Sequence, residues 1–415
     1  MEELVFGEKK AYRVAAFLDG DGRTRYIVQR NDTFEPSVAL SLYEQYLAHK
    51  SGSSKSTKDV LEKLVHFFTW ADIEGVDVEG MLLRGETPTA VQVRSFVYWL
   101  GKRITNSGRE KDKMGLSTYN KVLMYCGAMF GWFVMHYGVF NETNNMENLD
   151  RQKLRDFVKG MFGVNKKKDK QKRFADDLSE EEIGIIEAYL KPGNRKDVNK
   201  ATAHRDYLMW RLAIEFGFRE GEILALRLED CPHGRQQHIS IVRVEERGKN
   251  YHDPRGTNSP RPKTLSRQLG FILKDSPIPR LLSDYMSEHR CRVVTFLGKT
   301  KVQPVLDHNF LIINHQRKDG RPLSAAGMQR IAEKISQNTG VTFRWHIARH
   351  AFFNRMYAGI ASSPDYKDRL LDLVEFGGWS DEKSLQLYIN RARRIRATNA
   401  LIFWQSGGVT WNALR

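Results

Sequence analysis

Cysteine is scarce in this chain of 415 residues. The three cysteines, Cys126, Cys231 and Cys291, lie far apart and form no Cys-x-x-Cys pair. An odd count without metal-binding spacing indicates reduced thiols that fill apolar cores in a cytoplasmic protein. We therefore expect neither a disulfide framework nor a cysteine-ligated zinc site.

Long apolar runs are also missing. No segment approaches the ~18 uncharged apolar residues that a membrane-spanning helix needs. The first residues, Met1-Glu-Glu-Leu, lack the basic and apolar regions of a secretory signal. The sequence therefore predicts a soluble, intracellular protein without membrane partners.

Acidic residues are too few to balance the basic ones. The chain has 66 Lys and Arg against 50 Asp and Glu, a formal net charge of +16. An excess this large is typical of proteins that bind a polyanion, and nucleic acid is the commonest one. The chain length predicts two or three compact units, and 41% hydrophobic residues can supply their cores.

The first third of the sequence predicts a β-hairpin followed by helices. Two apolar runs within 11–30 are joined by Asp19-Gly-Asp-Gly, which favours a turn. Beyond them, apolar residues recur at helical spacing near 38–47, 57–70, 91–104 and 118–137. We assign residues 1–35 to a hairpin extension and 36–165 to a helical domain.

A basic segment ends this domain. Six of the eight residues at 166–173 are basic, namely Lys166, Lys167, Lys168, Lys170, Lys172 and Arg173. A solvated linker and a linker lying along a phosphate backbone both fit this composition. Ser179-Glu-Glu-Glu182 has capping-box spacing, so we expect a linker over 166–177 and a second domain over 178–415.

The second domain is predicted to mix helices with a short sheet. Alternation indicates a strand at 238–244, and 268–273 is a candidate partner strand. Helices are expected near 207–216, 220–228, 325–337, 346–357, 367–376 and 382–389. The predicted fold class is α+β and mostly helical, with an N-terminal helical DNA-binding bundle before a mixed α/β catalytic domain.

Four short patterns in this domain carry reactive groups. Their residues are Arg219 with Glu222; His346, Arg349 and His350; Phe376-Gly-Gly-Trp379; and Tyr388, nine residues after Trp379. Each is weak alone, because an Arg-x-x-Glu pair commonly lies on a helix surface and most tyrosines are packed aromatics. In this order and spacing they resemble the tyrosine recombinase (phage integrase) family, over about residues 178–395.

The resemblance implies a role for each residue. Arg219 matches the family's first catalytic arginine, with Glu222 as its acidic companion. His346 and Arg349 match the His-x-x-Arg box, and Trp379 stands where many members have His. Tyr388 matches the nucleophile. His350 is expected to brace the site by hydrogen bonding.

The implied reaction needs no metal and no nucleotide. The Tyr388 phenolate attacks a phosphodiester, expels a 5′-hydroxyl and keeps the phosphate as a 3′-phosphotyrosine, which conserves the bond energy. Arg219 and Arg349 would stabilise the charge on the non-bridging oxygens. Trp379 and His346 would add hydrogen bonds, with His346 a possible acceptor of the tyrosine proton.

The lysine that protonates the leaving group has two candidates. Lys249, in Arg247-Gly-Lys-Asn, lies at nearly the family's usual distance from Arg219. Lys263, in Lys263-Thr-Leu-Ser-Arg267, resembles the start of the return strand in members with a long hairpin loop. We favour Lys263, because an adjacent strand would hold it rigidly.

A zinc site is the alternative interpretation of the two histidines. His346 and His350 have i, i+4 ligand spacing. No acidic residue stands between them, however, and Arg349 would repel a cation. We therefore expect no metal and no other cofactor.

The resemblance also implies partners. One partner is duplex DNA with a specific core site. The other is the chain itself, with four copies acting as a tetramer on two duplexes. The resemblance does not decide whether accessory proteins take part. The helical domain would be the family's core-binding (SAM-like) domain, and Arg391, Arg393 and Arg394 are expected to contact DNA after Tyr388. The setting would be a prokaryotic or phage nucleoid, where the enzyme integrates or mobilises a DNA element.

Three questions stay open at this point. A type IB topoisomerase would use the same residue types, and a DNA-binding regulator of the same fold could have lost catalysis. The apolar tail Ala400–Trp404 could dock on a neighbouring copy or pack on its own domain. The hairpin could be a DNA-contacting arm or an ordinary β addition.

Overall fold

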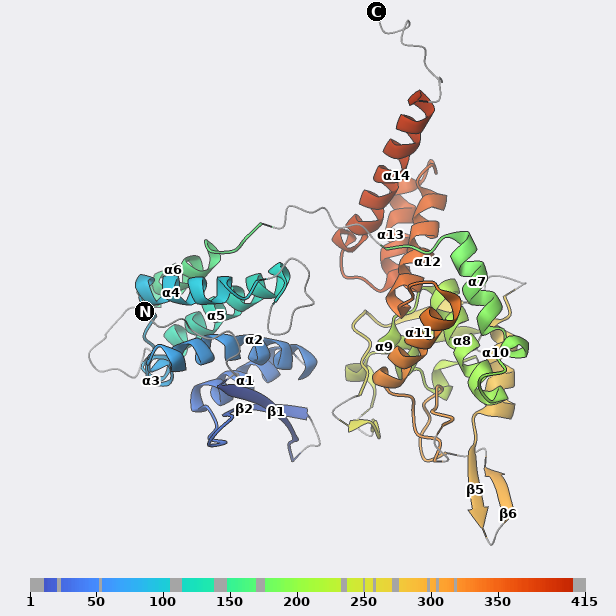
Figure 1. Ribbon diagram of the computed structural model, residues 1–415, viewed down its shortest axis with the longest axis horizontal. Coiled ribbons are helices and arrows are strands. Elements are labelled where there is room, and N and C mark those ends of the chain that lie inside the picture. The colour runs from blue at the N-terminus through green and yellow to red at the C-terminus, as the bar shows by residue number, and fades with distance from the viewer. Residues whose placement is uncertain are drawn as a thin grey trace, which may run out of the picture. The chain divides into compact units, whose positions relative to one another are not determined.

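The computed structural model divides the chain into two compact units, Met1–Lys172 and Arg173–Arg415, which are described separately (Figure 1). It describes residues 11–20, 24–51, 54–104, 114–137, 148–168, 176–232, 237–248, 251–256, 259–270, 276–296, 299–303, 306–316 and 319–405. Within these ranges helices dominate, and the strands form three two-stranded antiparallel sheets. This confirms the predicted α+β, mostly helical class.

The first unit joins a hairpin to a helical bundle. The predicted hairpin is present as β1 (Tyr12–Leu18) and β2 (Thr24–Arg30). The helices are α1 (Val38–Ser51), α2 (Ser54–Ile73), α3 (Val78–Leu83), α4 (Ala90–Gly101), α5 (Leu116–His136) and α6 (Asn148–Gly163). Tyr26 and Val28 of β2 are buried in the helical core, and Arg25 pairs with Glu44 of α1 at 2.6 Å. The hairpin is thus packed into the bundle.

An aromatic cluster fills the centre of this unit. The Phe67 ring lies 4.8 Å from Phe96, 5.3 Å from Phe130 and 6.1 Å from Phe162, measured between ring centroids. Phe162 belongs to α6, which the sequence analysis had not located. Its two fully buried side chains, Val158 and Phe162, make only a narrow apolar stripe on a highly charged helix.

The second unit builds one large core around α8. Its α-helices are α7 (Glu180–Leu190), α8 (Lys200–Phe216), α9 (Glu220–Ala225), α10 (Ile278–Asp284), α11 (Ala325–Thr339), α12 (Trp345–Ile360), α13 (Tyr366–Gly377) and α14 (Gln386–Gln405). Short 3₁₀ turns lie at Pro192–Asn194, Leu228–Asp230, Val244–Glu246 and Glu382–Leu385, and a π-turn at Tyr285–His289. The side chains of Leu208, Trp210 and Leu212 are fully buried in this core.

Most elements predicted for this unit are present with shifted ends. The Ser179–Glu182 capping box starts α7 as expected. The two predicted strands pair as β3 (His238–Ile241) and β4 (Arg267–Gly270), each shorter than expected. The helix expected over 382–389 is a 3₁₀ turn that leads into the much longer α14.

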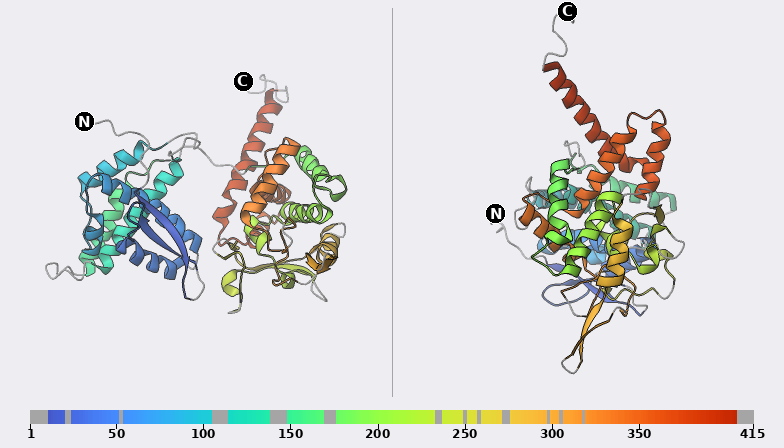
Figure 2. Two further views of the ribbon diagram at one scale, coloured as in Figure 1. Left: turned by 60° about the horizontal axis from the view of Figure 1, so that its bottom comes forward. Right: turned by 90° about the vertical axis from the view of Figure 1, so that its right-hand side faces the viewer.

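One hairpin escaped prediction. It consists of β5 (Arg292–Phe296) and β6 (Lys299–Gln303), and it projects from the body of its unit in Figure 1 and in the right-hand view of Figure 2. The run Val293-Val-Thr-Phe296 has the β-branched and aromatic composition that could have indicated it.

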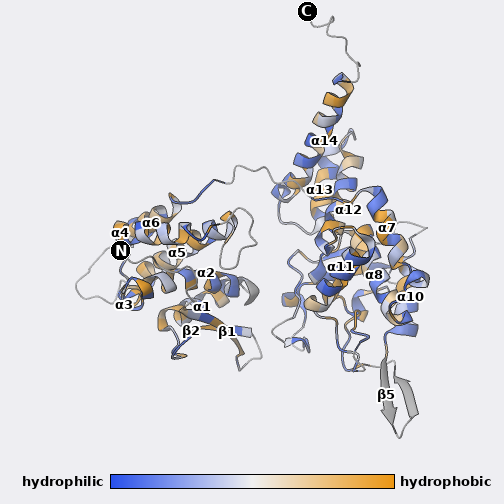
Figure 3. Ribbon diagram, in the orientation of Figure 1, coloured by the Kyte–Doolittle hydropathy of each residue, from blue (hydrophilic) through white to orange (hydrophobic). Residues whose placement is uncertain are grey.

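The outer end of α14 is apolar and exposed. The helix extends beyond α12 and α13, and orange residues mark its far end in Figure 3. Leu401, Ile402, Phe403 and Trp404 are each more than half exposed. Packing of this tail on its own domain, one of the two expectations, is therefore not what the structure has. Among the described residues, no helix is long and apolar enough to cross a membrane.

Candidate active site

A left-handed glycine turn places Arg219 at the start of α9. Gly217 ends α8 with φ 61°, and a Cβ there would lie 2.5 Å from a ring carbon of Phe352. Only glycine fits such a conformation and such a close approach. The turn brings Arg219 to the N-cap of α9, where its backbone N–H donates to Glu222 Oε2 at 2.9 Å.

Glu222 is the buried acidic centre of the site, with 1% of its surface exposed. Its carboxylate accepts from Arg267 Nη1 at 3.1 Å and Nη2 at 3.0 Å, and from the Thr264 hydroxyl. Burial alone would raise the pKa of Glu222, but Arg267, Arg349 and Thr264 together lower it to about 2. The carboxylate is therefore charged and fully bonded.

One backbone carbonyl positions both of the predicted catalytic arginines. Gly377 O, at the end of α13, accepts from Arg219 Nη1 at 3.2 Å and from Arg349 Nη2 at 3.0 Å. Arg349 Nη1 also donates to Gly217 O at 2.5 Å. The two guanidiniums, 130 positions apart in the sequence, are thus fixed side by side.

A second glycine turn closes the site from the other side. Gly378 has φ 60°, and a Cβ there would lie 2.8 Å from both Thr264 and Arg267. Its carbonyl accepts from the Leu265 N–H at 3.1 Å. The Gly-Gly pair before Trp379 therefore serves close packing of α13 against the segment that leads into β4.

The arginines lie against an aromatic wall. The Arg349 guanidinium is 4.9 Å from the Trp379 ring centroid and 4.6 Å from that of Phe353. Arg219 is 5.9 Å from the Trp379 ring. The Trp379 ring thus contacts both guanidiniums, and the hydrogen bond expected from its indole to the phosphate stays a prediction. Burial, with the charge of Arg219, lowers the pKa of Arg349 to about 9, which leaves it cationic at neutral pH.

Tyr388 lies in the first turn of α14 and is 3% exposed. Its hydroxyl is 3.1 Å from Nδ1 of His350. Burial raises the pKa of Tyr388, while the positive charges of Arg349 and Arg219 oppose that rise. The phenol is therefore held between an imidazole and the two guanidiniums.

The histidine next to Tyr388 is His350, which was expected to brace the site by hydrogen bonding. His346, named as one possible acceptor of the tyrosine proton, instead lies edge-on to His350, with their ring centroids 4.2 Å apart. Burial, and then the neighbouring His346, lower the pKa of His350 to about 4. The pKa of His346 is also lowered, first by partial desolvation and then by the positive charges of Arg349 and Arg219. At neutral pH His350 is therefore uncharged, and its Nδ1 faces the Tyr388 hydroxyl.

Of the two candidate lysines, Lys263 lies in the described part of the chain. Lys263 is exposed and lies in the loop before β4, not on the strand itself. Its neighbour Thr264 is buried against Glu222, so the loop at Lys263 borders the site. Lys249 lies outside the described residues.

The residues expected to contact DNA are partly described. In the basic segment, the Asn120 side chain bonds both the N–H of Lys167, at 2.9 Å, and its carbonyl, at 2.8 Å. Lys166 and Lys168 are also described, whereas Lys170, Lys172 and Arg173 lie outside the described residues. In α14, Arg391 pairs with Asp177 at 2.8 Å, and Arg393 and Arg394 are exposed.

Sequence reasoning missed Thr264 and Arg267 as members of the site. Both stand in the quoted Lys263-Thr-Leu-Ser-Arg267 run, and their spacing places both side chains on Glu222. The described part of the chain contains no group of three or more His, Cys, Asp and Glu side chains arranged to hold a metal.

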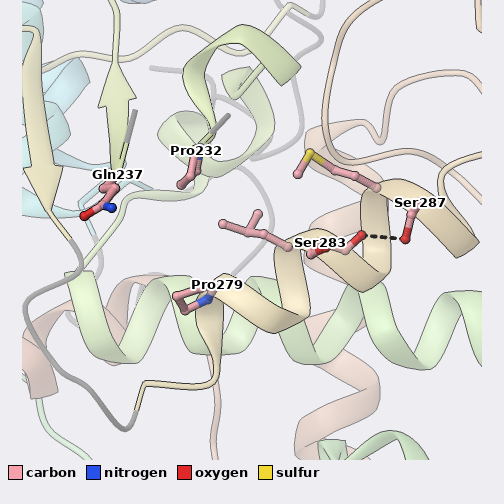
Figure 4. Close-up of a pocket in the computed structure, with 7 residues that line it drawn as sticks. Pro232, Gln237, Pro279, Ser283 and Ser287 are labelled. Carbon is pink, nitrogen blue, oxygen red and sulfur yellow. Dashed lines mark hydrogen bonds between the residues drawn. The ribbon is translucent and has the colours of Figure 1, made fainter. Parts of the chain in front are cut away.

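A separate hollow of about 660 Å³ lies beside α10 (Figure 4). It is lined by Pro232, Gln237, Pro279, Leu282, Ser283, Met286 and Ser287. None of these residues belongs to the cluster around Tyr388.

Comparisons with known proteins agree with the motif assignment. Residues 177–394, just over half of the chain, match the family described as the phage integrase family. No curated protein sequence matches significantly.

Among solved structures, the XerH site-specific recombinase in a post-cleavage complex with palindromic difH substrate has a TM-score of 0.50 at 14% identity, covering 86% of this chain and 82% of that one. The XerH pre-cleavage complex with difH gives 0.49 at 13% identity, covering 85% and 81%. A lambda integrase (75–356) dimer on a COC′ core site gives 0.47 at 13%, covering 83% and 94%.

The first of these structural matches supports a shared fold, and the family match covers every residue of the cluster built above. Arg219, Glu222, His346, Arg349, Trp379 and Tyr388 all lie within 177–394. This chain therefore belongs to the phage integrase family of tyrosine recombinases.

Proposed function

We propose that this protein is a site-specific DNA recombinase that cleaves and rejoins duplex DNA through a 3′-phosphotyrosine at Tyr388. The observation that carries the proposal is the contact of a buried tyrosine hydroxyl with the neutral His350, 3.1 Å away, beside two fixed guanidiniums. A nucleophile, a proton acceptor and an anion-stabilising pair are the parts that phosphoryl transfer to an alcohol requires.

The nucleophile would be prepared by proton transfer within the site. The Tyr388 hydroxyl gives its proton to Nδ1 of His350, which burial keeps uncharged at neutral pH and therefore able to accept. The charges of Arg349 and Arg219 favour the phenolate. The oxygen of Tyr388 then attacks phosphorus, and the 5′-oxygen leaves.

The two arginines would hold the phosphate. Each donates to Gly377 O through one nitrogen and retains further N–H donors for the non-bridging oxygens. Because Gly217 and Gly377 fix Arg349, little reorganisation is needed as charge develops. The departing 5′-oxygen takes a proton from Lys263 or from Lys249.

The substrate in this proposal is duplex DNA with a specific core site. The net charge of +16 supports a polyanionic ligand. The helical unit with Lys166, Lys167 and Lys168, and Arg393 and Arg394 after Tyr388, would contact the backbone. The remaining basic residues of the segment, Lys170, Lys172 and Arg173, belong to the same proposed contact.

The active form would contain several copies of the chain. The exposed apolar end of α14, Leu401–Trp404, suits contact with a second copy, because soluble monomers seldom expose such a group of large apolar side chains. A tetramer on two duplexes, with or without accessory proteins, is the proposed assembly. Catalysis itself would need no metal and no nucleotide.

A suicide duplex tests the proposal. Short inverted repeats in the DNA that flanks the gene supply the core sequence, and a nick near the scissile phosphate traps the covalent adduct. The wild-type protein should form a denaturation-resistant complex in EDTA without nucleotide, and Tyr388→Phe should bind the duplex without forming it. Efficient relaxation of supercoiled plasmids that lack the site would instead indicate a topoisomerase. Binding without any adduct would indicate a regulator.

A further inference from the structure

Arg267 is a buried cation that the proposed chemistry leaves without a role. Its side chain is 3% exposed and forms a two-pronged ion pair with the fully buried carboxylate of Glu222, with Nη2 3.0 Å from Oε2. Nη1 also donates to the Thr264 hydroxyl at 3.0 Å. An ion pair buried this completely stabilises a fold weakly compared with apolar packing, which suggests a role in function.

The charges around Glu222 explain what Arg267 contributes. Arg219 Nη1 is 3.3 Å and Arg349 Nη1 is 4.0 Å from the carboxylate. Without Arg267, the negative charge of Glu222 would be shared by these two guanidiniums alone. With Arg267 present, three guanidiniums face one carboxylate, and a net charge of about +2 remains for the phosphate.

Arg267 supplies this charge without facing the nucleophile. The cations that act on Tyr388 are Arg349 and Arg219. Arg267 reaches the site from β4, behind Glu222, and close packing against Gly378 holds it there. A phosphodiester that is attacked by an anion passes through a doubly negative pentavalent state, which a net charge of +2 matches.

We propose that Arg267 is a positioning residue for strand cleavage: it neutralises Glu222, so that Arg219 and Arg349 keep their charge and their free donors for the scissile phosphate. Thr264 fixes the rotation of the same carboxylate. The inference rests on the proposed recombinase function and adds a further charged participant to it.

A double-mutant cycle tests this role. Arg267→Gln leaves the charge of the Glu222 carboxylate to be neutralised by Arg219 and Arg349 alone, and we expect single-turnover cleavage to fall about 10-fold, less than the ~10²–10³ of a direct donor. Adding Glu222→Gln removes the negative charge that these two arginines would otherwise neutralise. The double variant should therefore cleave faster than Arg267→Gln alone. If Arg267 only holds the fold together, the second substitution will leave the rate unchanged or lower it further.

A substrate change keeps the test decisive if the double variant folds poorly. A methylphosphonate at the scissile position removes one negative charge from the phosphate. On that substrate the defect of Arg267→Gln should shrink or vanish, whereas a structural defect would persist on both substrates.

A matched control comes from another buried ion pair of the same unit. Arg205 pairs with Asp206 at 2.7 Å and donates to the Ile313 carbonyl. Arg205→Gln should lower stability while the folded protein cleaves at the wild-type rate on both substrates. If wild-type protein forms no adduct, the proposed function itself fails. If wild type cleaves but Arg267→Gln is equally slow on both substrates and the double variant is no faster, the role of Arg267 alone is refuted.

Discussion

The two units of this chain fill their interiors differently. In the helical unit, the buried polar side chains among the described residues are Ser37, Glu44, Thr57 and Thr69. The mixed unit buries five arginines and four carboxylates, namely Arg195, Arg205, Arg267, Arg290 and Arg349 with Asp206, Glu222, Asp230 and Asp253. One interior is built mainly from apolar residues, many of them aromatic, and the other from apolar residues together with charges.

The difference indicates that the core of the helical unit serves stability, whereas buried charges of the mixed unit also serve the reaction. Apolar burial stabilises a fold without directional demands, whereas a buried charge costs free energy unless it is paired or hydrogen-bonded. In the mixed unit Arg205 and Arg267 have carboxylate partners, while Arg349 donates to two backbone carbonyls beside Tyr388. We expect substitutions in the first unit to change stability and those around Arg349 to change rate.

The largest expected loss of stability follows removal of a central ring of the helical unit. Phe67→Ala should lower the free energy of unfolding of this unit by about 3–5 kcal/mol, because Phe67 is packed against three other phenylalanines. Denaturant unfolding followed by circular dichroism measures it. Phe157→Ala, at a residue 61% exposed in α6, is the matched control and should change stability by less than about 0.5 kcal/mol. An equal effect of both substitutions would contradict the central position of Phe67.

Removal of a buried arginine should instead act on the reaction. Arg349→Ala should slow cleavage about 10²–10³-fold, since it removes a donor directed at the phosphate. Single-turnover cleavage of the suicide duplex gives the rate, and circular dichroism checks folding. Arg330→Ala in α11, whose side chain bonds only the Ala326 carbonyl among the contacts described here, should cleave normally. A near wild-type rate for Arg349→Ala would reduce Arg349 to a phosphate anchor.

The rate loss caused by removing Lys263, the exposed lysine next to the buried cluster, should depend on how basic the leaving group is. Lys263→Ala should cleave normal DNA about 100-fold more slowly, as is typical of a lost general acid. A 5′-bridging sulfur leaves as a thiolate, with a pKa near ~8.5, and should largely restore the rate. Arg219→Ala should not be restored, because the non-bridging oxygens are unchanged. If Lys249→Ala shows the defect and the rescue while Lys263→Ala cleaves normally, Lys249 is the general acid.

Most of the helices, one strand pair and the main site residues could be predicted from the sequence. The contacts between side chains that decide the chemistry could not. Periodic apolar residues indicate which face of a helix is buried, so α1, α2, α4, α5, α12 and α13 were expected, whereas α14 was not. The pairing of β3 with β4 followed from alternation. The family resemblance carried by the order and spacing of the motifs implied that Arg219, Arg349 and Tyr388 share one site.

The remaining features depend on neighbours that are distant in the sequence. Thr264 and Arg267 meet Glu222 across more than 40 residues, and no local pattern indicates such a contact. The choice between His346 and His350 depends on how α12 faces α14. A motif that contains both rings does not fix that orientation.

The smallest expected effect is the acid sensitivity of the mixed unit. The pKa of His350 is lowered to about 4 and that of His315 to about 3, in both cases first by burial. The unfolded chain binds these protons below about pH 6.5, whereas the folded chain does not bind them until the pH is far lower. The free energy of unfolding should therefore keep its full value above pH 6.5 and decrease as the pH falls toward 4.

Thermal unfolding at pH 7.5 and 4.5 measures this dependence. His350→Asn should reduce the loss of melting temperature between the two pH values by a few degrees, on the order expected for ~1 kcal/mol in a unit of this size. An unchanged loss would mean that His350 titrates normally in the folded protein.

The most direct test of the central claim is the location of the covalent bond. The wild-type protein is trapped on the suicide duplex, the adduct is digested with protease and nuclease, and the nucleotide-bearing peptide is sequenced by mass spectrometry. We predict a single modified residue, Tyr388, joined to a 3′-phosphate, and a free 5′-hydroxyl on the released strand. A nucleotide on any other residue, or a 5′-phosphate link, would contradict the assignment of Tyr388 as the nucleophile.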